Sequence, residues 1–249
     1  MRYSRVPEDA TLPAVVERDE RETRLEDLRG REKAHSREGD AIAAERRRLP
    51  MVEVDASLEL VGPQGTTTLL EAFDGRRQLL AYFAMWHTGS PASEQCPGCT
   101  WCMAHLGELS YLHSRDITVA VLAQGPYDEG RRYRDFMGWS VPWYSALPSL
   151  DRLLVGRARG MMHLVSYVRC RDRVFETYWT TRRGVEVLDS SYRLMDLTVW
   201  GRQERHEDSP DGWPQGWHNV DGEHVLCHDG RPIAQWARVE SGCDDSLTG

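Results

Sequence analysis

Two cysteines separated by two residues, Cys96 and Cys99, are the residues of this sequence best suited to chemistry. Pro97, which lies between them, is typical of the first position of a helix, where a missing N–H costs no hydrogen bond. Cys96 would then be the N-cap, and its sulfur would face free backbone N–H groups and the positive end of the helix dipole. Both favour thiolate over thiol, so the spacing predicts that Cys96 is a nucleophile.

Cys99 lies one helical turn further along the chain. An i,i+3 pair at a helix start has its α-carbons about 5 Å apart, within the range that a disulfide accepts. We therefore expect Cys99 to be the resolving thiol of a redox-active dithiol, the arrangement that C-x-x-C indicates at the start of a helix after a strand. Cys102, three residues later, is a third candidate catalytic thiol that would act as a relay.

Two other interpretations of the cysteines remain open. Cysteine is among the most buried residue types, so the three thiols would also fit an inert structural cluster. With His105 they form a C-x-x-C-x-x-C-x-x-H ladder that would suit zinc or part of an iron–sulfur cluster. Structural zinc sites usually draw their ligands from two separated pairs, and the sequence has no second, separate C-x-x-C. The sequence therefore favours a dithiol that needs neither metal nor cofactor.

The residues around the cysteine pair supply further candidates. Trp86 and Trp101 would wall the site and help to select an apolar partner surface, so we expect them to bind substrate, although both also suit ordinary packing. His87 is a candidate proton donor, and Glu94 a candidate proton shuttle. A loop histidine and a loop glutamate are more often solvated, and the charge of Glu94 would raise the pKa of the Cys96 thiol.

Five blocks of sequence, in this order, resemble one known family. The blocks are residues 45–50 (ERRRLP), 73–79 (FDGRRQL), 96–99 (CPGC), 137–143 (MGWSVPW) and 196–204 (DLTVWGRQE). The chain resembles, over about residues 10–205, the thioredoxin-like family catalogued as domain-of-unknown-function family 899, which is described as predicted dithiol-disulfide oxidoreductases. The resemblance implies a thioredoxin fold related to the alkyl hydroperoxide reductase and thiol-specific antioxidant group, and a thiol-disulfide oxidoreductase activity.

Departures from the patterns of those relatives leave two alternatives. A peroxidatic site in the related group carries proline seven residues and Thr or Ser three residues before its cysteine; here Ser93 holds the second place, but Gly89 holds the first and Pro91 is displaced. A peroxiredoxin-like peroxide reductase is therefore one alternative. No proline precedes the strand expected at 164–168, where thioredoxins place the residue that positions a partner's backbone. A non-catalytic thioredoxin-like binding module is the other alternative.

Composition limits the partners. The 249 residues carry a formal net charge of −8 and a pI near 5.6, which argues against nucleic acid or an anionic membrane surface as the main partner. No apolar run approaches the length that spans a bilayer, and the N-terminus lacks the apolar stretch of a signal peptide. Six cysteines fit a reducing compartment. We expect a cytoplasmic protein that acts on a protein or small-molecule disulfide, or on peroxide.

The first part of the chain differs in composition from the rest. Residues 1–50 form a charged helical arm in this interpretation, with helical material from 13 to 48 and a thin apolar stripe. Gly30 and Gly39 are expected to weaken or break that helix. The arm would lie on the surface of the domain, or it would form a homodimer or bind a partner.

Residues 51–205 are expected to form one α/β domain with a thioredoxin-like fold, a mixed central sheet flanked by helices. The expected elements are a hairpin at 52–69, a central strand at 78–85, a helix at 97–113, a strand at 117–123, a helix at 128–137, a hairpin at 164–180 and a closing helix at 184–195. Residues 206–249 lose periodicity and are expected to be a loop-rich, mobile extension. Cys170 and Cys243 are expected to be incidental.

Overall fold

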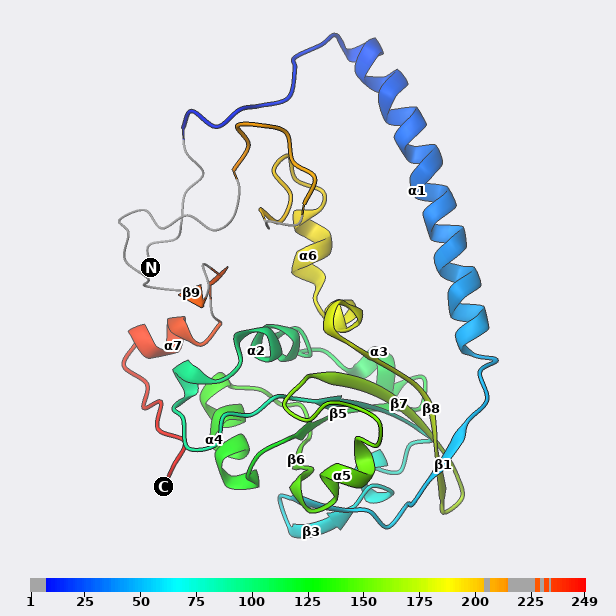
Figure 1. Cartoon of the computed structure of the whole chain (residues 1–249), viewed down its shortest axis with the longest axis vertical. Helices are drawn as coiled ribbons and strands as arrows, with labels where there is room; N and C mark the ends of the chain where they lie inside the picture. The colour runs from blue at the N-terminus through cyan, green and yellow to red at the C-terminus, as the bar shows by residue number, and fades with distance from the viewer. Residues whose placement is uncertain (1–7, 204–206, 215–226, 229–230, 233) are drawn as a thin grey trace.

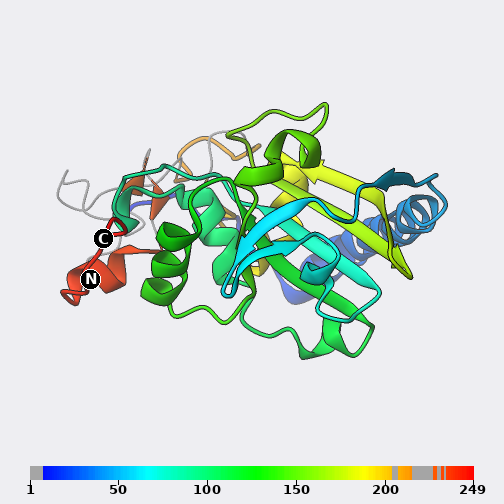
Figure 2. The ribbon, with the colours of Figure 1, turned by 90° about the horizontal axis from the view of Figure 1, so that it is seen from below.

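An eight-stranded mixed sheet forms the centre of the protein (Figures 1 and 2). The computed structural model describes residues 8–203, 207–214, 227–228, 231–232 and 234–249. The strand order is β1-β8-β7-β4-β5-β6-β2-β3. The strands are β1 (Val52–Val54), β2 (Glu59–Gly62), β3 (Gly65–Thr68), β4 (Gln78–Phe83), β5 (Ile117–Ala123), β6 (Trp143–Ser145), β7 (His163–Cys170) and β8 (Arg173–Thr181).

The α-helices vary greatly in length. They are α1 (Arg18–Arg46), α2 (Pro97–Ala104), α3 (Ser110–His113), α4 (Tyr127–Met137), α5 (Leu150–Leu153), α6 (Ser190–Met195) and α7 (Trp236–Glu240). Two strands near the C-terminus, β9 (Cys227–His228) and β10 (Arg231–Pro232), pair antiparallel with each other. None of the helices in the described part of the chain combines the length and the apolar character that crossing a bilayer requires.

The order and direction of the strands confirm the expected fold class. β4 and β5 are parallel neighbours joined through α2 and α3, and β6 continues the parallel part beyond β5. On the other side of β4, β7 and β8 run antiparallel as a hairpin. A strand–helix–parallel strand unit followed by an antiparallel hairpin is the thioredoxin-like arrangement that the sequence predicts.

β4 lies in the middle of the sheet and is buried on both faces, as its continuous apolar run predicts. Leu80 and Tyr82 pack on the face that carries the three cysteines, whereas Leu79, Ala81 and Phe83 pack into a second hydrophobic cluster on the opposite face. The strand is thus fixed from both sides. Its C-terminal end leads into residues 84–96, the loop that ends at Cys96 and that we call the cysteine loop.

Two expectations about strands need correction. β1 does not join the hairpin expected at 52–69, because it pairs with β8 at the opposite edge of the sheet, and only β2 and β3 form that hairpin. β6 (Trp143–Ser145) is also absent from the elements that the sequence predicts. It has three residues, and so short a stretch shows no periodic pattern.

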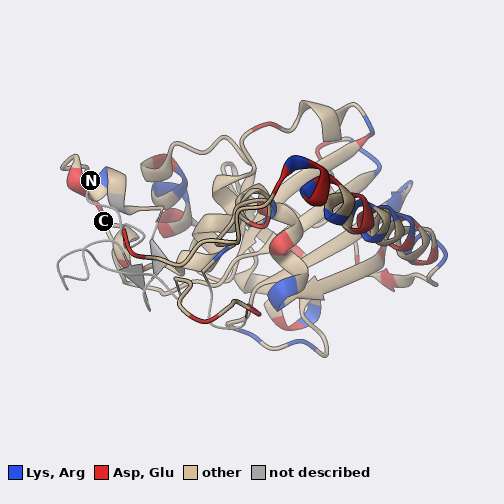
Figure 3. Ribbon diagram, turned by 90° about the horizontal axis from the view of Figure 1, so that it is seen from above, with Lys and Arg blue, Asp and Glu red and all other residues tan. Residues whose placement is uncertain are grey.

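The charged helix near the N-terminus is continuous within the stretch 13–48 in which the sequence predicts helix. α1 runs without interruption through Gly30 and Gly39, so the expectation that these glycines would break it is wrong. It has no buried residue, and acidic and basic side chains alternate along it (Figure 3). Ion pairs within the helix, such as Arg24 to Glu20 at 2.6 Å, add to its local stability.

The helix expected at 97–113 is two helices separated by a break. α2 ends at Ala104 because the His105 side chain bonds the Trp101 carbonyl through Nδ1 at 2.9 Å. The backbone N–H of His105 donates to the Cys102 carbonyl, three residues back, and not to the Trp101 carbonyl, four residues back. This bond tightens the last turn of α2. Gly107 follows in the break, and α3 restarts the helical path toward β5.

The closing helix expected at 184–195 is also divided. A 3₁₀ segment, Arg182–Leu188, ends at Asp189, whose carboxylate accepts a hydrogen bond from the Ser191 N–H at 2.8 Å and caps α6. Arg202 secures this region through Asp196 at 2.7 Å and Glu186 at 3.0 Å. The cap stops one helix and starts another, which residue spacing alone does not reveal.

The exposure of α1 gives a prediction about its glycines. A Cβ added at Gly30 or Gly39 would meet no atom within 4 Å. Gly30→Ala and Gly39→Ala should therefore each stabilise α1 by about 0.5–1 kcal/mol and slow amide hydrogen exchange along it about threefold. The urea midpoint of the domain should not change, because α1 buries no residue.

Gly130→Ala is the contrasting control, because its Cβ would overlap the indole of Trp143. This variant should lose about 1–3 kcal/mol of stability and unfold at lower urea concentration. A domain midpoint that moved with the α1 variants, or an unchanged midpoint in Gly130→Ala, would contradict this account.

Candidate functional site

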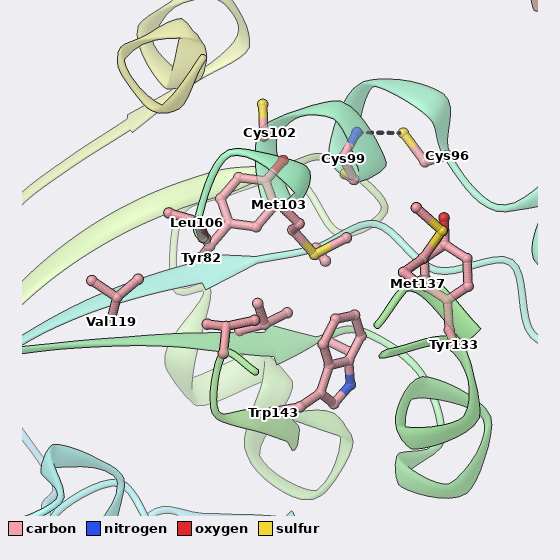
Figure 4. Close-up of a cluster of buried hydrophobic side chains, with 14 of the residues drawn as sticks. Tyr82, Cys96, Cys99, Cys102, Met103, Leu106, Val119, Tyr133, Met137 and Trp143 are labelled. Carbon is pink, nitrogen blue, oxygen red and sulfur yellow. Dashed lines mark hydrogen bonds between the residues drawn. The ribbon is translucent and has the colours of Figure 1, made fainter. Parts of the chain in front are cut away.

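Cys96 occupies the N-cap of α2, as Pro97 in the first helical position predicts. Its Sγ accepts a hydrogen bond from the Cys99 N–H at 3.4 Å, shown as a dashed line in Figure 4. The same sulfur lies 3.7 Å from the Sδ of Met85, which is two residues beyond the end of β4. The strand and the helix therefore hold the Cys96 sulfur between them.

These contacts lower the pKa of Cys96 to about 6 from the ordinary thiol value of 9.0. The largest cause is a hydrogen bond from the Cys99 thiol, and the N–H groups of Cys99 and Gly98 and the nearby His87 act in the same direction. Burial opposes them, since it disfavours the charged form. At neutral pH the balance leaves Cys96 as a thiolate.

Cys99 has the opposite character. Its pKa lies well above the usual value because its proton is shared with the Cys96 sulfur and because it is buried, 1% exposed. The Met85 N–H donates a hydrogen bond to the Cys99 Sγ at 3.3 Å. The pair is thus one thiolate beside one thiol, which is the asymmetry that a nucleophile and a resolving thiol require.

Cys102 lies one turn beyond Cys99 on the same helix. Burial, with the charge of Asp189, raises the pKa of the Cys102 thiol to about 11. The Tyr82 hydroxyl lies near the sulfurs of both Cys99 and Cys102, and burial raises the pKa of this hydroxyl as well. Cys102 is therefore protonated at neutral pH, so its expected role as a relay requires a proton acceptor.

The three thiols and His105 do not gather into a metal site. His105 bonds the Trp101 carbonyl and the Ser191 hydroxyl, at 2.9 and 2.8 Å. Within the ranges that the structure describes, no group of three or more His, Cys, Asp and Glu side chains is arranged to hold a metal ion. His105 instead connects the end of α2 to the first turn of α6.

Gln95, to which no sequence motif assigns a role, holds the loop before Cys96 in place. Its buried amide donates to the carbonyls of His87 at 2.8 Å and Ser90 at 3.1 Å, and its Oε1 accepts from the His87 N–H at 3.1 Å. The His87 ring in turn bonds the Glu94 carbonyl at 2.8 Å. His87 and Glu94 are both exposed, so their side chains lie at the rim of the site.

A second group of buried polar side chains fixes the backbone of Cys96. The Thr100 hydroxyl donates to the Cys96 carbonyl at 2.8 Å and bonds the Tyr133 hydroxyl of α4 at 2.5 Å. The Gln235 amide also donates to Thr100, at 3.2 Å. A C-x-x-C pattern does not identify these three residues, because they come from three distant parts of the chain.

The two tryptophans expected to bind substrate are both engaged in packing. Trp86 packs edge-on against Tyr133 and Trp143, and its Nε1 donates to Glu129 at 2.8 Å. Trp101 stacks on a tyrosine of α6, Tyr192, with ring centroids 5.2 Å apart. Both are half-buried, and substrate binding by them stays a prediction.

Met162 stands directly before β7, near the place where thioredoxins carry a proline. It packs against the cluster that contains the cysteines. Of the positions compared with peroxidatic sites, Ser93 bonds the Asp245 carboxylate at 3.2 Å, and Gly89 donates from its N–H to Glu129. The Ser93 hydroxyl is therefore directed toward Asp245 in this structure.

Fold and site together define a thioredoxin-like protein with a dithiol at the N-terminus of a helix. A family model described as "Bacterial protein of unknown function (DUF899)" matches residues 10–223, and the chain belongs to this family. A search of curated proteins finds no significant match.

Solved structures with a similar fold include three proteins at low sequence identity. Peroxidoxin BcpB from Mycobacterium tuberculosis is 15% identical, with 54% of this chain and 86% of that chain covered and a TM-score of 0.39. Thioredoxin from Wuchereria bancrofti is 14% identical, with coverages of 55% and 89% and a TM-score of 0.36. Apo Sco1 protein from Thermus thermophilus is 15% identical, with coverages of 56% and 88% and a TM-score of 0.34.

The lowered pKa of Cys96 can be measured by alkylation. The rate of iodoacetamide reaction at Cys96 should rise with pH around a midpoint of about 6. Cys99→Ala should move the midpoint upward, because it removes the largest stabilising contact while it keeps the backbone N–H. A midpoint near 9.0 in the unchanged protein would show that the helix start does not stabilise the thiolate.

Thr100→Val tests the polar group behind Cys96. The change keeps the shape of the side chain but leaves the buried Tyr133 hydroxyl and the Gln235 amide with fewer partners. It should cost about 1–3 kcal/mol in the free energy of unfolding, measured by urea denaturation. Thr198→Val is the matched control, because that hydroxyl bonds a carbonyl at an exposed position. Equal losses in both variants would contradict the role of Thr100.

Proposed function

We propose that the protein is a thiol-disulfide oxidoreductase that uses Cys96 as its nucleophile and Cys99 as its resolving thiol. One observation carries the proposal: the Cys96 sulfur caps the first turn of α2, where its contacts lower its pKa, and the buried Cys99 thiol lies one turn away on the same helix. A low-pKa thiolate beside a protonated partner is the arrangement that exchanges with disulfides.

The two steps follow from the charges of the pair. The Cys96 thiolate attacks one sulfur of a substrate disulfide, which forms a mixed disulfide and releases the other sulfur as a thiolate. Cys99 then loses its proton to the released thiolate or to solvent and attacks the Cys96 sulfur. The products are a second substrate thiol and a Cys96–Cys99 disulfide, so two electrons pass from the protein to the substrate.

The contact between the two sulfurs also favours the second step once the first has occurred, because it controls the pKa of Cys99. The pKa of Cys99 is raised chiefly because its proton is shared with the Cys96 sulfur, and the charge on that sulfur adds to this effect. Once Cys96 carries a substrate sulfur, that charge is gone and the Cys99 thiolate is less disfavoured. The hydrogen bond from the Met85 N–H remains to stabilise it.

The environment that we propose is the cytoplasm. Support comes from the free cysteines of the described chain, Cys96, Cys99, Cys102, Cys170 and Cys243, which suit a reducing compartment. The acidic net charge of −8 suits a partner that is neither a nucleic acid nor an anionic membrane surface. No cofactor takes part in the proposed exchange.

Cysteine variants separate the two steps. With bis(2-hydroxyethyl) disulfide as substrate and reduced protein in a single turnover, Cys96→Ser should react no faster than the buffer. Cys99→Ser should stop at the mixed disulfide, seen as one substrate thiol added to the protein mass. Cys170→Ser is the control, because Cys170 is exposed on the far hairpin, and it should behave as the unchanged protein.

In the unchanged protein the expected end product is the Cys96–Cys99 disulfide with no added mass. Reaction with hydrogen peroxide at a higher rate than with the disulfide would indicate the peroxide reductase alternative. No reaction above the buffer rate in the unchanged protein would indicate the non-catalytic binding module. Equal rates in the unchanged protein and in the Cys96→Ser and Cys99→Ser variants would exclude the proposed mechanism.

A further inference from the structure

The C-terminal part of the chain lies directly against the cysteine loop. We define residues 235–247 as the C-terminal strap, which runs from α7 past α2 to α4 (Figure 1, red). The Gln235 side chain is completely buried, and its Nε2 donates to the Gln95 carbonyl at 3.1 Å and to the Thr100 hydroxyl at 3.2 Å. The strap therefore begins next to the backbone of Cys96.

A second set of contacts joins the strap to an earlier part of the loop. The Asp245 carbonyl accepts a hydrogen bond from the Ala92 N–H at 2.8 Å, and its carboxylate accepts one from the Ser93 hydroxyl at 3.2 Å. The strap thus contacts the loop three to four residues before Cys96, in addition to the contact at Gln95.

The end of the strap is anchored in the core. Leu247 is 2% exposed and belongs to the buried cluster that contains the three cysteines. Its carbonyl accepts a hydrogen bond from Arg132 of α4 at 3.0 Å, and Arg238 of the strap bonds the Met137 carbonyl at the end of α4. These contacts make the strap part of the folded structure around the site.

The candidate nucleophile beside the strap has little exposed surface. Cys96 is only 8% exposed, and disulfide exchange requires a close approach of the substrate sulfur to the attacking sulfur. An extended peptide commonly docks beside a site through main-chain hydrogen bonds. The Ala92 N–H and the Gln95 carbonyl, the backbone groups beside Cys96 that would serve this purpose, are already bonded to the strap.

We propose that the strap makes low-molecular-weight disulfides the substrates of this site and excludes disulfides held in proteins. The proposal rests on the proposed function and specifies its substrate class. A small disulfide reaches Cys96 past the strap, takes two electrons from the Cys96 and Cys99 thiols, and leaves as two small thiols. An external dithiol then reduces the Cys96–Cys99 disulfide for the next turnover.

The test compares one small and one protein substrate. Second-order rate constants of the reduced full chain are measured with bis(2-hydroxyethyl) disulfide and with insulin, and their ratio is divided by the same ratio for free dithiothreitol. We expect the ratio of the two rate constants, small disulfide over insulin, to be at least about tenfold larger for the protein than for dithiothreitol, because access to Cys96 governs the difference. A ratio equal to that of dithiothreitol would overturn the proposal.

Variants that release the strap sharpen the comparison. Leu247→Ser should raise the rate with insulin about tenfold and change the rate with the small disulfide less than about threefold, because the anchor is lost but Cys96 and Cys99 remain. Arg132→Ala, a milder change, should act in the same direction if Leu247→Ser does not fold. Leu197→Ser is the matched control, because Leu197 is 81% exposed. Unchanged insulin rates in both release variants would refute the strap's role.

Failure of the proposed function would look different, since neither disulfide would then react. The strap is in that case tested by alkylation of a Cys170→Ser, Cys227→Ser, Cys243→Ser protein with iodoacetamide and with polyethylene-glycol maleimide. We expect the small reagent to modify Cys96 and the polymer to do so only after Leu247→Ser. Equal access of both reagents to the protein with its strap in place would overturn the proposal.

Discussion

The hydrogen bond from the Cys99 N–H to the Cys96 sulfur is the interaction on which the rest of the site depends. A thiol as buried as Cys96 would ordinarily keep its proton, because burial disfavours the charged form. The Cys99 thiol, together with the N–H groups of Cys99 and Gly98 at the start of α2, reverses that tendency and lowers the pKa of Cys96. Their effect requires that Pro97 begin the helix where it does and that β4 deliver the loop to the same point.

The parts of this structure that the sequence could predict are those set by local spacing. The continuous apolar run of β4 placed it in the sheet centre, and β5 has the bounds that its apolar residues indicate. Pro97 located the helix start and made Cys96 the N-cap. Each of these features depends on residues within a few positions of one another, so the pattern contains the information.

The parts that it could not predict depend on distant residues or on single side chains. The breaks after α2 and before α6 come from the side chains of His105 and Asp189, which compete with or cap the backbone. Thr100, Tyr133 and Gln235 meet only after the chain has folded. Residues 235–247, which lie in the stretch that lacks periodicity, contact the loop before Cys96 through Gln235 and Asp245.

The hydrogen bond between the Met85 N–H and the Cys99 sulfur has a consequence for the sheet itself. A thiol, a thiolate and a disulfide sulfur differ in strength as acceptors, so this bond changes whenever Cys99 changes its chemical state. Met85 follows β4 after a single intervening residue. Its amide resonance would consequently report any oxidation of Cys99, at the point where the central strand meets the cysteine pair.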